Sequence, residues 1–348
     1  MKKHWLWFIG FIIIIVVAWH LVTNAYREEE KSIRSRFRES VKDTFSEQSK
    51  EFLQSFGLFY YDTGQKITEV TIKREDAIIL VHGLDDPGKV WQNLAPALIQ
   101  EGFYVWRMRY PNDQPIVASA KLFFEELKDL QESGIQRISI VAHSMGGLVS
   151  REMLTNPDID YSIAVNKGQV PKVVSLTMVG TPNHGSEMAR FRIFSEMRDQ
   201  MARIQKGETS WIGAILDGAG EAKIDLLPGS RFLTELNARP HPARVDMLVI
   251  AGISSPWNEN EINGWTDSLH QKLSPEWKNQ IDSLGNYMIS MTHGLGDGLV
   301  TIESACLEGV AHITVEGTHL TMIRNIILES RRVPPAVPII IKRLKERK

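Results

Sequence analysis

The chain of 348 residues contains a single cysteine, Cys306. One cysteine excludes an internal disulfide, but it does not fix the compartment, because many proteins outside the cytoplasm lack disulfides. A surplus of positive charge is also missing, since the formal net charge is −2. Nucleic-acid binding requires a basic stripe or patch, so we predict no nucleic-acid partner. Internal repeats and low-complexity tracts are absent, and the length suits one large α/β domain with additions.

Charge is also absent from residues 5–22, WLWFIGFIIIIVVAWHLV, which are apolar except for His20. A run of this length spans a hydrocarbon core, which needs roughly 20 apolar residues, and tryptophans near its ends are typical of membrane interfaces. The alternative is a cleaved signal peptide. However, residues 23–25 (TNA) form a poor cleavage site, and the run exceeds the usual apolar region of roughly 7–15 residues. We therefore predict that residues 1–26 form an uncleaved transmembrane signal-anchor.

The charges around this segment give conflicting signals about its orientation. Lys2 and Lys3 precede it and favour a cytoplasmic N-terminus. Basic residues also follow it and favour the opposite orientation: Arg27, Lys31, Arg34, Arg36 and Arg38. A short basic tail before a long apolar run is typical of a signal-anchor, so we expect a single-pass membrane protein with an extracytoplasmic catalytic domain.

Residues 27–65 are expected to form a charged, amphipathic stalk helix. Apolar residues recur at spacings of four and seven, which places them on one helix face: Ile33, Phe37, Val41, Phe45, Phe52 and Phe56. We expect this face to pack on the domain. The alternative is a helix that lies on the membrane surface.

Residues 66–330 show strands that alternate with helices, which predicts a mostly parallel sheet with helices on both faces. Residues 77–81 (AIILV) have the continuous apolar character of a buried parallel strand. Further strands are predicted at residues 66–73, 104–109, 137–142, 173–179, 245–251, 287–291 and 311–315. Helices are predicted near residues 90–100 and 118–133 and directly after Ser144.

Two long insertions interrupt this alternation, at residues 183–244 and 254–286. Long insertions in a compact domain usually form functional lids or subdomains. The first carries apolar residues at near-helical spacing, which predicts a helical cap or a mobile lid over an acyl-chain groove. Residues 331–348 are expected to be a solvated basic C-terminal tail, with contact to anionic lipid as the alternative.

The segment IVAHSMGGLV, residues 140–149, has the pattern of a strand that turns sharply into a helix at Ser144. The two backbones approach closely at such a turn, so the positions two before and two after the serine must be small. Ala142 and Gly146 satisfy that condition. The turn exposes the hydroxyl, and the helix N-terminus supplies free N–H groups for a developing oxyanion. We predict that Ser144 is a catalytic nucleophile.

Acyl transfer also needs two donors for the oxyanion. The N–H of Met145 directly follows the nucleophile, and the N–H of Leu84 lies in the loop after the buried strand at residues 77–81. These two groups are the predicted oxyanion hole. We assign His82 a structural role in bracing that loop, because it precedes the serine.

The base and the acid are expected after the serine in the chain. His319 follows the last strand in a glycine-containing loop, VEGTHL, and is the predicted base. Other histidines after the serine fit less well: His184, His241, His270, His293 and His312. Asp297, between two glycines in GLGDGLV, is the predicted acid that orients the imidazole. Asp246 would lie at the wrong end of its strand, and Asp267 and Asp282 fall in the second insertion.

Together these motifs resemble bacterial lipases and esterases of the α/β-hydrolase superfamily. The matching motifs, in order between Ala77 and Asn325, are VHGL, AHSMGG, GTPNHGS, GDGLV and EGTHL. The resemblance implies an α/β-hydrolase fold with Ser144, Asp297 and His319 as the catalytic triad. The retained anchor departs from the secreted members. Some members bind calcium, but the acidic residues here form only a loose cluster, so we predict no metal and no cofactor.

The predicted activity is hydrolysis of carboxylic esters, with lipid or other apolar acyl esters as substrates, through an acyl-enzyme. An acyltransferase, a thioesterase or an amidase would use the same triad. A catalytically inactive binding protein of the same fold is the alternative from another class. The sequence does not specify substrate-binding residues, acyl length or oligomeric state.

Overall fold

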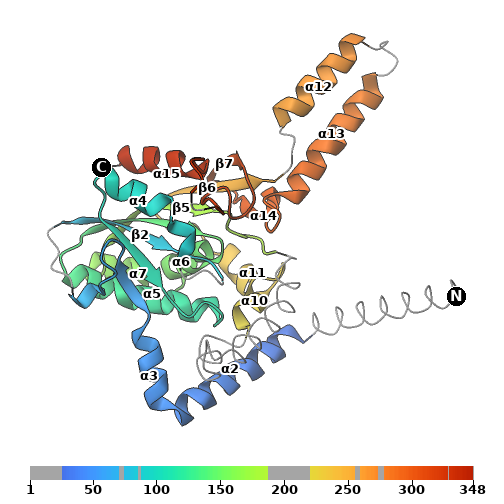
Figure 1. Ribbon diagram of the computed structural model, residues 1–348. Helices are drawn as coiled ribbons and strands as arrows, with labels where there is room; N and C mark the ends of the chain where they lie inside the picture. The colour runs from blue at the N-terminus through green and yellow to red at the C-terminus, as the bar shows by residue number, and fades with distance from the viewer. Residues whose placement is uncertain are drawn as a thin grey trace.

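A mostly parallel sheet forms the centre of the molecule. The computed structural model describes residues 26–69, 74–84, 88–186, 220–254, 259–272, 278–327 and 329–347. Within these residues the sheet has seven strands in the order β1-β3-β2-β4-β5-β6-β7 (Figure 1). Only β1 is antiparallel to its neighbour. The strands are β1 (Gly57–Tyr60), β2 (Asp76–Val81), β3 (Val105–Arg109), β4 (Arg137–His143), β5 (Lys172–Val179), β6 (Asp246–Ile253) and β7 (Ala311–Glu316).

Helices cover both faces of this sheet, as predicted. The helices of the main body are α4 (Leu94–Gln100), α5 (Ile116–Glu132), α6 (Met145–Thr155), α7 (Tyr161–Asn166), α14 (Ile302–Ala305) and α15 (Ala336–Lys345). Alternate β2 residues enter two separate cores: Ile79 packs on the side of α5 and α6, and Ile78 on the side of α4 and α15. Because both faces are buried, β2 is apolar throughout. The α/β class is confirmed, and the sheet order is consistent with an α/β-hydrolase fold.

The first insertion contains two short helices in its described part, α10 (Glu221–Asp225) and α11 (Arg231–Asn237). The remaining part, residues 187–219, lies outside the described residues, as does the expected amphipathic segment within it. The second insertion forms a helical hairpin of α12 (Glu259–Lys272) and α13 (Lys278–Leu295), which projects from the body (Figure 1).

The strand predicted at residues 287–291 is wrong, because these residues belong to α13. A five-residue apolar run does not distinguish a strand from a segment of a buried helix. Moreover, β6 pairs directly with β7, so the sheet has no place for a strand between them. The strand predicted at residues 66–73 is also not found in its described part, where Ile67–Glu69 is a 3₁₀ turn.

The predicted domain boundaries also need correction. Residues 27–65 contain two helices, α2 (Arg27–Thr44) and α3 (Ser46–Gln54), followed by strand β1 of the sheet. The expected solvated tail, residues 331–348, contains α15, whose Val337, Ile340 and Leu344 are buried at helical spacing. The α/β body therefore begins near Gly57 and extends through α15, beyond the predicted limits of 66 and 330.

No helix within the described residues is long and apolar enough to cross a bilayer. The predicted anchor, residues 1–26, lies outside the described residues except for Tyr26.

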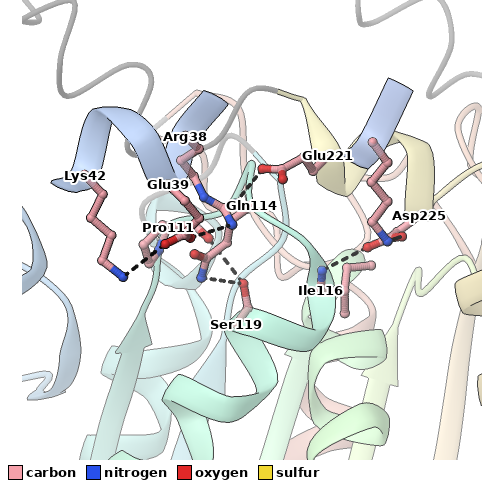
Figure 2. A network of polar contacts seen from close by, with 10 residues as sticks. Arg38, Glu39, Lys42, Pro111, Gln114, Ile116, Ser119, Glu221 and Asp225 are labelled. Atoms are coloured by element: carbon pink, nitrogen blue, oxygen red, sulfur yellow. Dashed lines mark hydrogen bonds and ion pairs between the residues drawn. The ribbon is translucent and has the colours of Figure 1, made fainter. Parts of the chain in front are cut away.

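Helix α2 packs on the body mainly through charged side chains, and of the apolar face expected on α2 the buried residue is Val41. Arg38 Nη1 donates to Glu221 Oε2 at 2.5 Å (Figure 2), and Lys31 forms an ion pair with Asp225. Asp225 Oδ2 also accepts from the backbone N–H of Ile116, the first residue of α5, at 3.0 Å. By contrast, the side chain of Ile33 on α2 is 67% exposed. Paired charges thus fix α2 to α10 and α5.

We expect Arg38→Ala to lower the free energy of unfolding by about 3 kcal/mol, because it removes the cationic partner of the fully buried Glu221. The matched control is Arg36→Ala, since Arg36 lies on the exposed side of α2 and its one hydrogen bond to the described residues is to Ser32 Oγ. Urea unfolding measures both variants. Equal midpoints for the two variants would contradict the proposed importance of the buried ion pair.

Candidate active site

Ser144 occupies the sharp turn between β4 and α6. Its φ of 53° and ψ of −129° place a non-glycine residue at positive φ, which costs free energy and is typical of functional sites. Gly146 allows this turn: a Cβ there would lie 2.3 Å from Val81 O and 2.5 Å from His82 O. Both obstacles are backbone atoms, so a larger residue would separate α6 from the end of β2. The predicted strand–serine–helix turn is present.

The two predicted oxyanion donors flank this serine. Met145 is the first residue of α6, so its N–H lies at a helix N-terminus. On the other side, a Cβ on Gly83 would lie 2.6 Å from Ser144 Cβ, which shows how closely the loop leading to Leu84 passes the serine. Residues 85–87 lie outside the described residues. The loop at Gly83, which leads to Leu84, and the first residue of α6 therefore both lie beside the Ser144 side chain.

His82 braces the loop before Leu84. Its Nδ1 lies 2.8 Å from Gly83 O, and its ring stacks on Tyr110 with centroids 4.5 Å apart. The Tyr110 hydroxyl donates to His82 O at 2.5 Å. Burial raises the pKa of Tyr110, so the hydroxyl keeps the proton that this bond requires. These contacts agree with the structural role predicted for His82.

His319 and Asp297 form a buried pair. His319 Nδ1 lies 2.7 Å from Asp297 Oδ2, and the His319 N–H donates to Asp297 O at 2.9 Å. The other carboxylate oxygen, Oδ1, accepts from the backbone N–H groups of Leu299 at 2.9 Å and Val300 at 2.8 Å. A buried carboxylate is costly unless its oxygens are hydrogen-bonded, and here both oxygens have partners. The carboxylate is thereby aimed at the imidazole.

Asp297 follows helix α13, not a strand as predicted, yet it still reaches the carboxyl end of the sheet. The Ser254 N–H, just after β6, donates to Gly296 O at 2.6 Å. At the end of β5, Gly180 has a φ of +59°, and a Cβ there would lie 3.0 Å from Asp297 Oδ2 and 3.1 Å from His319 Nδ1. A glycine at this position leaves room for the pair.

His143, which the sequence did not single out, connects Ser144 to His319. Its Nε2 lies 2.9 Å from His319 O, and the two rings are 4.7 Å apart. Within the described residues no hydrogen bond joins Ser144 to His319. Catalytic contacts are often long before substrate binds. The structure thus brings Ser144, His319 and Asp297 to one edge of the sheet, and only the last two are in hydrogen-bond contact.

Three other candidate histidines lie away from this group. His241 bonds to Glu308 O, His270 pairs with Asp282, and His312 is exposed on β7. Asp246 begins β6 at the opposite edge of the sheet and pairs with Arg343. Among the described residues, no group of three or more His, Cys, Asp and Glu side chains is arranged to hold a metal ion.

A hollow of about 630 Å³ lies beside the loop that carries Asp297, here called the acid loop. It is lined by residues of that loop, of α13 and of the described part of the first insertion, including His184, Pro228, Leu295, Leu299 and Thr301. Residue order alone does not indicate this hollow, because its walls come from segments far apart in the chain.

Burial lowers the pKa of His143 well below its ordinary value, and the neighbouring His319 ring lowers it further. The unfolded chain therefore binds a proton near pH 6.5 that the folded chain rejects, so stability falls as the pH drops below about 6.5, by up to about 1.4 kcal/mol per pH unit. We expect His143→Gln to reduce this slope while its amide still donates to His319 O. Urea unfolding in detergent at pH 7.5, 6.5 and 5.5 measures the slope. His312→Gln is the exposed control, and an unchanged slope in His143→Gln would refute the expectation.

Comparison with known proteins gives one family model and several similar structures. A domain of unknown function, DUF7379, matches residues 117–281, which is less than half of the chain. The mature Bacillus licheniformis lipase BlEst2 is similar at 16% identity and a TM-score of 0.47, over 78% of this chain and 94% of that one. The phospholipase PlaB from Legionella pneumophila is similar at 18% identity and a TM-score of 0.48, over 77% of this chain and 59% of that one. Staphylococcus hyicus lipase is similar at 13% identity and a TM-score of 0.49, over 79% of this chain and 96% of that one. At these sequence identities and TM-scores, the similarity does not establish the activity of this chain.

Proposed function

We propose that this chain is a membrane-anchored serine hydrolase that cleaves carboxylic esters through an acyl-enzyme. One observation carries the proposal: Ser144 stands on a strained strand–helix turn, at the same sheet edge as the hydrogen-bonded pair of His319 and Asp297. A nucleophile at a helix N-terminus, with an imidazole and a buried carboxylate nearby, is the arrangement that acyl transfer requires.

In the proposed first half-reaction, Ser144 Oγ attacks the ester carbonyl carbon and its proton passes to His319 Nε2. The carbonyl oxygen becomes an oxyanion, which the N–H groups of Leu84 and Met145 stabilise. His319 then protonates the departing alcohol, and an acyl group remains on Ser144. In the second half-reaction, His319 takes a proton from water, the hydroxide attacks the acyl carbon, and Ser144 is released with its proton restored.

Asp297 stabilises the imidazolium that forms in both half-reactions. Its Oδ2 accepts from His319 Nδ1–H, which leaves Nε2 free to exchange protons. The two backbone donors at Oδ1 keep the carboxylate from turning away.

Apolar acyl esters are the proposed substrates. The hollow beside the acid loop includes Leu295, Leu299 and Pro228, which offer an apolar wall for an acyl chain. We further propose that residues 183–244 act as a cap over this region. The anchor at residues 1–26 would hold the site near lipid, and Lys2 and Lys3 favour a catalytic domain outside the cytoplasm.

Ser144→Ala should lower ester hydrolysis by a factor on the order of 10⁴ or more, because only oxyanion stabilisation and binding remain. The fold should persist, since the change removes one oxygen atom. Hydrolysis of a soluble p-nitrophenyl ester and labelling by a fluorophosphonate probe are the measurements. Probe labelling that survives in this variant would exclude Ser144 as the nucleophile. Product analysis with an added alcohol distinguishes hydrolysis from acyl transfer.

Asp297→Asn should lower kcat by roughly 10⁴-fold, because the amide N–H₂ would face His319 Nδ1 and favour the wrong tautomer. The amide oxygen still accepts from Leu299 and Val300, so the loop should keep its shape. Asp282→Asn is the matched control, since Asp282 lies on α13 and is 47% exposed. Near-normal kcat in Asp297→Asn, with folding of both variants checked by circular dichroism, would assign the acid elsewhere.

A further inference from the structure

Helix α2 presents its basic side to the protein. Arg27 Nη1 donates to Pro228 O at 3.3 Å, and Lys31 pairs with Asp225. Further along the same face, Arg38 pairs with Glu221 and is only 8% exposed (Figure 2). An amphipathic helix of a water-soluble domain normally buries its apolar side. In α2 the side that faces the body is mostly charged, and Val41 is the apolar residue buried there.

Three apolar side chains of this segment face outward, whereas Val41 further along α2 is buried. Tyr26, Ile33 and Phe37 are 61%, 67% and 54% exposed. Their spacings of seven and four residues place them in one stripe along the helix. Over the helical rise of 1.5 Å per residue, the stripe is roughly 16 Å long. Contiguous exposed apolar side chains of this kind mark an interaction surface.

This stripe lies on the same side of the molecule as the candidate active site. The contacts of α10 lead from α2 to the loop after β3: Ala222 N donates to Asp113 O at 3.2 Å, and Asp225 accepts from Ile116 N at 3.0 Å. That loop starts at the carboxyl end of β3, and Ser144 follows the carboxyl end of β4. Because carboxyl ends of parallel strands meet at one edge of a sheet, α2 is attached to the edge that carries Ser144.

We propose that Tyr26, Ile33 and Phe37 rest on a lipid bilayer, and that α2 thereby turns the Ser144 edge toward the membrane. The sequence before α2 indicates that a bilayer is what covers this stripe. The apolar run of residues 5–22 ends four residues before Tyr26, and four residues extend at most about 14 Å. A helix that starts so close to the bilayer, with an aromatic residue at its beginning and an apolar outer stripe, has the features of an interfacial helix.

This docking proposal rests on the proposed function, and it specifies where the substrate of that function comes from. A site held toward the bilayer takes esters carried by lipids in that membrane, in preference to esters dissolved in water. The ion pairs of α2 supply the rigidity that such an orientation needs, because they connect the stripe to α10 and α5.

The test places a single fluorophore on the full-length chain in phosphatidylcholine–phosphatidylglycerol vesicles. Cysteines at Ile33 and Phe37 are introduced one at a time in a Cys306→Ser background that retains fluorophosphonate labelling. Ile163→Cys is the control, because Ile163 is 45% exposed on α7, which precedes the amino end of β5. We expect doxyl-labelled lipid to quench positions 33 and 37, and aqueous iodide to quench only position 163.

Three other outcomes overturn the docking proposal in different ways, and a fourth overturns only the proposed function. Labels at 33 and 37 that iodide quenches as it does at 163 would show that the stripe faces water. Labels shielded from both quenchers would show that protein covers it, either residues 187–219 or a second copy. A chain that does not float with the vesicles would refute the anchor and the docking together. Loss of probe labelling at Ser144 alone would refute the hydrolase assignment and leave the docking intact.

A second experiment tests the orientation by comparing hydrolysis of vesicle-borne and soluble esters. Ile33→Glu combined with Phe37→Glu should lower the ratio of vesicle-borne to soluble ester hydrolysis by roughly tenfold, because charged side chains oppose burial at the lipid boundary. Ile163→Glu should leave that ratio near the wild-type value. An unchanged ratio in the double variant would overturn the proposal.

Discussion

The close approach of helix α6 to the end of β2 is the constraint on which the candidate site depends. At Gly146 the helix passes so near Val81 O and His82 O that a Cβ would overlap both atoms. This contact holds Ser144 at positive φ, directs its side chain out of the turn, and brings the loop at Gly83 against it. The proposed nucleophile and oxyanion donors thus follow from one backbone packing arrangement, which small residues alone permit.

The second half of the site depends on the satisfaction of buried polar groups. Asp297 comes from the loop after α13 and His319 from the loop after β7, and each is almost fully buried. The carboxylate tolerates burial because two backbone N–H groups and the imidazole bind its oxygens. His143 holds the carbonyl of His319 and remains neutral because it is buried.

Sequence patterns predicted the central strands because these are short apolar runs buried on both faces, as in β2, β4 and β5. These patterns gave wrong predictions where the same sequence pattern fits two different kinds of local structure. Residues 287–291 fit a strand locally but continue a long helix, and residues 331–348 combine a basic end with apolar residues at helical spacing that enter the core as α15. The apolar residues of α2 suggested packing on the domain, whereas buried ion pairs to Glu221 and Asp225 decide which side faces inward.

The sequence by itself determined the turn at Ser144 and the chain order of the proposed serine, acid and histidine, because these features rest on residue size and on short-range backbone geometry. Only the tertiary structure decided what Asp297 and His319 contact, how His143 supports them, and which side of α2 remains outside. Those features depend on pairings between segments separated by tens to hundreds of residues, such as Arg38 with Glu221 and His143 with His319. Local periodicity does not identify such distant partners, because many tertiary arrangements are compatible with the same sequence pattern.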